Sequence, residues 1–70
     1  MIPPEEVAAL AELYDRFAHA LDPFSAERDE AEQAFYLKLD HLHSAYAPRV
    51  NYQEFKREAV RQCKLFLRKN

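Results

Sequence analysis

Residues 47–59 read APRVNYQEFKREA and contain both the end of one predicted helix and the start of the next. Pro48 ends the first, because a proline ring clashes with the helical conformation of the residue before it. Asn51 followed three residues later by Glu54 resembles a capping box, in which two side chains bond free backbone N–H groups. Val50 and Phe55 occupy the two positions of a hydrophobic staple. The stretch therefore predicts a helix that begins directly after Asn51.

The residues on the N-terminal side of this stretch predict two further helices. Pro3 and Pro4 suit a helix start, and the acidic pair after them complements the positive end of the helix dipole. Pro23 ends that helix, and either Asp22 or Ser25 is the predicted N-cap of the next. In each segment apolar residues recur every three or four positions, the pattern of one helix face. The predicted helices cover residues 5–21, 25–46 and 52–68.

Glycine is absent from all 70 residues of the chain. Glycine is the usual residue where the backbone takes a positive φ, as in tight hairpin turns and phosphate-binding loops. Its absence disfavours β-hairpins and excludes a glycine-rich nucleotide loop. Short breaks between helices favour antiparallel neighbours. We therefore predict an all-α fold, an up-down-up three-helix bundle that forms one domain over residues 1–70.

A chain of 70 residues is near the lower size limit for a domain that folds alone, and its single cysteine excludes an internal disulfide. Helix packing or association must therefore supply the stability. The predicted core combines the apolar stripe of each helix with one residue of the first break. It consists of Val7, Leu10, Tyr14, Phe17, Leu21, Phe24, Phe35, Leu39, Leu42, Tyr46, Phe55, Ala59, Cys63 and Phe66.

The net charge of −2 conceals a strong asymmetry along the chain. Residues 49–70 carry seven basic and two acidic side chains, a net +5, whereas residues 1–48 carry three basic and ten acidic, a net −7. Such a chain can fold back on itself, pair with a neighbour, or present one basic surface. The acidic N-terminus does not resemble a signal peptide, and no apolar run approaches the roughly 20 residues that span a bilayer. We expect a cytoplasmic protein without membrane contact.

The titratable side chains do not form the pattern of a catalytic, cofactor or metal site. His41 and His43 are two positions apart, so on a helix they point about 200° away from each other and do not share a metal ion. Cys63 falls in the apolar stripe of the third helix, where a thiol acts as a small hydrophobe. A metal-dependent activity using Asp40 and His43 is the weakest alternative. We expect no enzyme, no cofactor and no small-molecule substrate.

Apolar residues exceed what three packed helices need. A helix in a small bundle needs an apolar arc about 100° wide, whereas the second predicted helix is apolar over roughly 200°. The leading hypothesis is therefore a non-enzymatic interaction module that self-associates, as a homodimer for example, or docks on a protein partner. The predicted contact residues are Leu13, Tyr36, Leu37, His41 and Leu65.

The main alternative is nucleic-acid binding by the third helix. Four basic residues at spacings of 4, 3 and 4 share one face, opposite the apolar stripe, and suit contact with phosphates. They are Arg57, Arg61, Lys64 and Arg68. Two observations weaken this alternative. Glu54 and Glu58 are spaced to pair with these cations, and the pI near 5.9 is far below the value of about 9 that is typical of nucleic-acid domains.

Overall fold

The computed structural model describes residues 2–69, which form three helices and no strand. Helix α1 spans Pro4–Ala18, α2 spans Ala26–Tyr46 and α3 spans Tyr52–Lys69. The predicted all-α, three-helix fold is confirmed. The second and third helices begin within one residue of their predicted starts, whereas α1 ends three residues before its predicted end.

The early end of α1 has a local cause. Ala18 is its last residue, although apolar residues continue in the helical pattern as far as Leu21. Pro23 keeps Asp22 out of the helical conformation. The Asp22 carboxylate instead accepts a hydrogen bond from the backbone N–H of Phe24 at 3.0 Å, which forms a turn. The turn at Asp22 therefore ends the helix, even though the apolar periodicity continues to Leu21.

The N-caps of α2 and α3 explain where these helices start. Ser25 is the N-cap of α2, and its hydroxyl accepts a hydrogen bond from the backbone N–H of Arg28 at 3.1 Å. The side chain of Asn51 accepts a hydrogen bond from the N–H of Gln53 at 2.9 Å, one position before Glu54. Both side chains satisfy N–H groups that the first helical turn leaves without a backbone partner.

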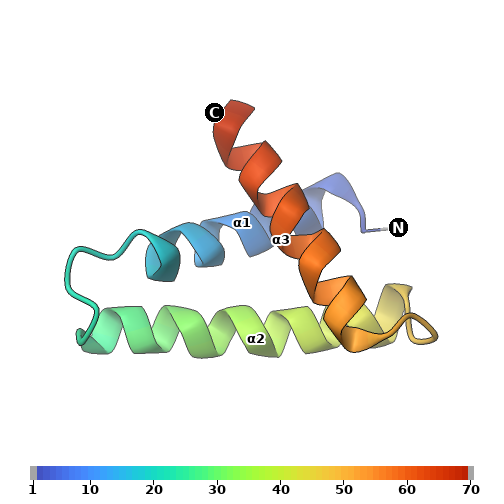
Figure 1. Cartoon of the computed structure of the whole chain (residues 1–70), viewed down its shortest axis with the longest axis horizontal. Helices are drawn as coiled ribbons and strands as arrows, with labels where there is room; N and C mark the ends of the chain where they lie inside the picture. Colours follow the sequence, from blue (N-terminus) through green and yellow to red (C-terminus); the bar gives the residue numbers. More distant parts are fainter. Residues whose placement is uncertain (1, 70) are drawn as a thin grey trace.

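Helices α1 and α2 lie side by side and run in opposite directions, whereas α3 crosses α1 obliquely (Figure 1). α2 and α3 diverge from the turn at 47–51. α1 packs extensively against both of them, while α2 and α3 contact each other much less. The acidic start of α2 lies at the opposite end of that helix from the turn that leads into α3 (Figure 1).

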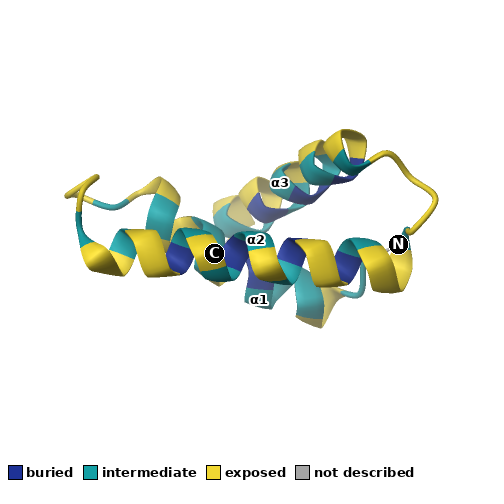
Figure 2. Cartoon of the chain, turned by 90° about the horizontal axis from the view of Figure 1, so that it is seen from below, coloured by how far each residue is buried: buried dark blue, intermediate teal, exposed yellow. Residues whose placement is uncertain are grey.

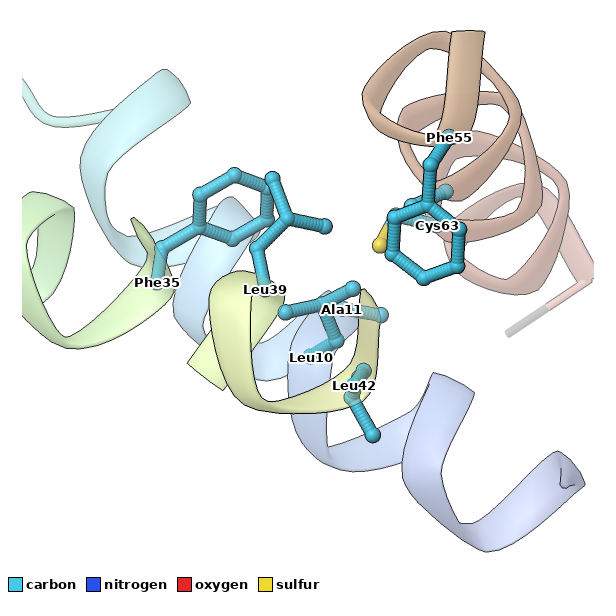
Figure 3. Packing of buried hydrophobic residues seen from close by; sticks show 8 residues of the cluster. Leu10, Ala11, Phe35, Leu39, Leu42, Phe55 and Cys63 are labelled. Atoms are coloured by element: carbon cyan, nitrogen blue, oxygen red, sulfur yellow. The ribbon is translucent and has the colours of Figure 1, made fainter. Parts of the chain in front are cut away.

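The core forms where the three helices meet. Its buried members come from all three helices, and Figure 3 shows Phe35 and Leu39 of α2 beside Leu10 and Ala11 of α1, with Phe55 and Cys63 of α3 on the opposite side. They are Leu10, Ala11, Phe35, Leu39, Leu42, Phe55, Ala59 and Cys63. A group of aromatic rings extends this core along α1 and α2. Tyr14 and Phe17 lie 5.8 and 5.0 Å from Phe35, measured between ring centroids.

For three residues the prediction that they belong to the core is wrong, because they are exposed. The side chains of Leu21 and Phe24 are 103% and 91% exposed, because α1 ends before it reaches them. Tyr46 is 44% exposed, because it is the last residue of α2, where the chain leaves the packed helix for the turn. Figure 2 shows the contrast between the buried positions along α2 and the largely exposed connection at its left end.

Most of the remaining prediction agrees with the structure. Seven of the fourteen predicted residues belong to the buried core, and Ala11 joins them from the α1 stripe. Three more lie partly buried against this core, where they cover its edges. These three are Tyr14, Phe17 and Phe66. Val7 is also of intermediate exposure.

Candidate functional site

The connection between α1 and α2 presents the most exposed large hydrophobic side chains of residues 2–69. They are Leu21 and Phe24, which we call the apolar tip. Single exposed apolar residues are common on protein surfaces. Here, however, two large side chains only three positions apart both face water. Such a pair marks a candidate contact with another molecule.

The backbone of the apolar tip is held in place. Asp22 accepts a hydrogen bond through its carboxylate from Phe24, and through its carbonyl from the backbone N–H of Ser25 at 3.3 Å. The ring of Pro23 between them fixes φ. Because the turn is already ordered, binding through the tip loses less conformational entropy than binding through a flexible loop.

The surroundings of the apolar tip carry an excess of unpaired negative charge. A depression beside Leu21 is lined by Asp22, Glu27 and Glu30. Among residues 2–69, Glu27 and Glu30 make no ion pair. The basic residues that line the same depression are paired on their own helices. Arg16 lies 2.9 Å from Glu12, and Arg28 lies 3.3 Å from Glu32.

The outer face of α3 carries the second candidate surface. All four basic residues of the alternative hypothesis, Arg57, Arg61, Lys64 and Arg68, are exposed. A shallow depression on this helix, which we call the basic groove, has six lining residues. They are Gln53, Lys56, Arg57, Val60, Arg61 and Lys64.

The cations of the basic groove differ in their partners. The guanidinium of Arg61 lies 2.6 Å from the Glu58 carboxylate, and its hydrogen bonds lower the pKa of Glu58. The Nζ atom of Lys56 lies 4.9 Å from the ring centroid of Tyr36 on α2. Arg57 and Lys64 make no ion pair within the described part of the chain. These two charges are therefore available to an anionic ligand.

The predicted partner-contact residues differ in exposure. Leu37 is 74% exposed and has exposed His41 one turn further along α2. Leu65, on α3, is 36% exposed. Leu13 and Tyr36 are partly buried against the core, so packing within the chain accounts for much of their apolar surface. The two residues of the apolar tip, Leu21 and Phe24, were predicted to lie in the core. The Asp-Pro pair that ends α1 early was the signal that could have revealed their exposure.

His43 lies in the last turn of α2, and its side chain fixes the turn that leads to α3. Its Nε2 donates a hydrogen bond to the carbonyl of Val50 at 2.6 Å. Its ring centroid lies 5.6 Å from that of Tyr52 and 5.1 Å from that of Phe55. Burial and a hydrogen bond to Asp40 raise the pKa of Tyr52. These contacts give His43 and Asp40 a structural role where the two helices meet.

No three His, Cys, Asp or Glu side chains within residues 2–69 are placed to hold one metal ion. Cys63 is completely buried, and burial raises the pKa of its thiol to about 11. A thiol in this state is a packing residue and a poor nucleophile. Neither the apolar tip nor the basic groove therefore contains a metal-binding cluster or a reactive thiol.

Comparisons with models of protein families, with curated proteins and with solved structures found no match. Within the described residues, no helix combines the length and the apolar character needed to cross a membrane. The apolar tip and the basic groove are the two surfaces from which a function can be inferred.

Proposed function

We propose that this chain is a small non-enzymatic interaction module that self-associates or docks on a protein partner through its apolar tip. The observation that supports this proposal is the full exposure of Leu21 and Phe24. Burying one such side chain contributes about 1.5–3 kcal/mol. The two together therefore supply a useful part of the free energy of a protein contact. A single, unpaired cysteine also supports the cytoplasmic location that we propose.

The first test removes the apolar tip. We expect the double substitution Leu21→Ser and Phe24→Ser to abolish association while changing the free energy of unfolding by no more than about 0.5 kcal/mol, because both side chains are outside the core. Association is measured as molar mass by light scattering, and as retention of proteins from an extract on the immobilised chain. Leu37→Ser is the matched control, since it removes another exposed leucine. Unchanged mass and retention in the double variant would contradict the proposal.

Nucleic-acid binding is a second candidate function, supported by the shared exposed face of Arg57, Arg61, Lys64 and Arg68. If all four contact phosphates of duplex DNA, the logarithm of the binding constant should fall against the logarithm of salt concentration with a slope of about −3.6. Reversing the charge of Arg57 and Lys64 should abolish binding. Gel retardation with single- and double-stranded DNA and RNA at low salt measures both effects. Absence of retardation with all four would exclude this candidate.

A further inference from the structure

We infer that the apolar tip of one chain docks in the basic groove of a second copy, and that two such contacts form a reciprocal dimer. This inference rests on the proposed function and names the partner of the tip. Three observations support it: the chemistry of the tip, the chemistry of the groove, and their separation within one molecule.

The tip is an apolar projection with an acidic border. Leu21 and Phe24 supply the apolar surface, and Glu27 and Glu30 line the depression beside Leu21 without an ion-pair partner among the described residues. A surface that buries this tip must therefore offer apolar contact at its centre. It must also offer cations around that centre, since burying unpaired carboxylates against a neutral surface is costly.

The basic groove has the complementary composition. Val60 gives it an apolar patch that is only partly exposed, and cationic side chains lie on either side. Of these cations, Arg57, Lys64 and Lys56 make no ion pair among residues 2–69. Lys56 lies against the ring of Tyr36. The groove therefore matches the tip in both charge and apolar character, and complementary charges of this kind select a partner and fix its register.

One molecule does not bring its own tip and groove together. The tip precedes the start of α2, whereas Lys56 of the groove lies against Tyr36, ten residues further along that helix. Ten residues of helix span about 15 Å at 1.5 Å per residue. α3 also diverges from α2 (Figure 1). The tip that fills a groove must therefore come from another molecule.

A two-fold axis across α2 satisfies both surfaces at once. When two copies pair about an axis that crosses α2 between its start and Tyr36, the start of α2 in one copy lies toward Tyr36 of the other, against which Lys56 of the groove packs. Each tip then meets the other copy's groove, and the assembly closes at two chains. Such a dimer also brings the acidic start of α2 in each copy beside the basic face of α3 in the other.

A second copy fits the groove better than a nucleic acid does. The phosphate backbone offers charge but no apolar group to cover Val60. The chain also has a net charge of −2, which repels a polyanion at long range. The acidic and apolar tip of a second copy complements both the cations of the groove and its apolar patch at Val60.

Exchange of charge between the two surfaces is the decisive experiment. The tip variant carries Glu27→Lys and Glu30→Lys, and the groove variant carries Arg57→Glu and Lys64→Glu. Light scattering should give the wild type twice the chain mass of 8.3 kDa, with dissociation at high salt. Each variant alone should be a monomer, because both of its contacts are repulsive. An equimolar mixture should recover the dimer, because both contacts in a mixed pair join opposite charges.

Disulfide trapping then locates the contact. A Phe24→Cys chain mixed with a Val60→Cys chain should form a mixed disulfide under mild oxidation, since a disulfide needs Cα atoms within about 7 Å. The native Cys63 is buried and its thiol has a pKa of about 11, so it stays unreacted. Leu37→Cys in place of Phe24→Cys is the control. Equal trapping by the control would overturn the proposed contact.

The outcomes separate this inference from the proposed function. A wild-type monomer at every concentration, or a mixture of charge variants that stays monomeric, overturns the second copy as partner. Loss of protein capture by the tip variant Leu21→Ser with Phe24→Ser would then still support docking on a different protein. Retardation of nucleic acid that depends on Arg57 and Lys64, in a chain that forms no dimer, would show that the groove binds a polyanion. This result would also overturn the inference.

Discussion

Phe35→Ala will leave the chain largely unfolded at 25 °C. Phe35 is 1% exposed, and the ring centroids of Tyr14, Phe17 and Tyr36 lie between 5.0 and 5.8 Å from its own. Truncating a buried phenylalanine costs about 3–5 kcal/mol, through lost burial and the cavity that remains. A domain of this size has a net stability of only about 3–5 kcal/mol. The cost therefore consumes most or all of the stability.

Thermal melting followed by circular dichroism tests this expectation. The wild type should melt cooperatively, whereas Phe35→Ala should lose helical signal already at 25 °C. Leu37→Ala is the matched control two positions away on α2, because its side chain is 74% exposed and its loss should cost no more than about 0.5 kcal/mol. A variant at position 35 that melts within a few degrees of the wild type would show that Phe35 does not organise the core.

The starts of α2 and α3 could be predicted because short-range chemistry determines them. Ser25 and Asn51 cap the helices that follow them through bonds to residues two or three positions away. The apolar tip could not be predicted from the pattern alone. The apolar periodicity of α1 continues to Leu21, and only the competing turn at Asp22 decides that the helix ends first.

The basic face and the predicted partner-contact residues also differ in how far the sequence alone predicts their exposure. The residues of the basic face share one side of any helix over 52–68, so their spacing alone predicts that face. Leu13 and Tyr36 were predicted to meet a partner, but their exposure depends on which helix lies beside them. α1 packs between α2 and α3, and both residues are partly buried against the core. That arrangement follows from packing across the whole chain, which one helix does not reveal.

The sequence reveals the charge asymmetry, but it does not show which of these charges form ion pairs in the fold. Among the described residues, the ion pair that joins two helices is Lys38 with Glu6, at 3.5 Å. The other ion pairs join residues no more than four positions apart in the sequence. Although α1 packs against α3, no ion pair among the described residues joins the acidic half to the basic half, which leaves charges of both signs available to a second molecule.

Stability should fall as the pH rises from 9 toward 11, because of Cys63. Burial raises the pKa of this thiol from 9.0 to about 11, since the apolar core disfavours the thiolate. The unfolded chain therefore releases the proton at lower pH than the folded chain. The stabilising effect of the neutral thiol is complete below pH 9 and is lost as the pH approaches the folded pKa. A pKa difference of this size between the folded and unfolded chain corresponds to about 2–3 kcal/mol, a large share of the stability of so small a domain.

Urea unfolding at several pH values from 8 to 11 measures this loss, with Cys63→Ala as the matched control. Alanine at this position has no thiol to ionise, although removing the sulfur leaves a small cavity. We expect the variant to be the less stable protein at pH 8 and to lose less stability than the wild type by pH 11. Lys, Arg and Tyr side chains titrate in both proteins, so the difference between the two curves isolates Cys63. Parallel curves would mean that the thiol ionises as readily in the folded chain as in the unfolded one, and that the core around α3 is open to water.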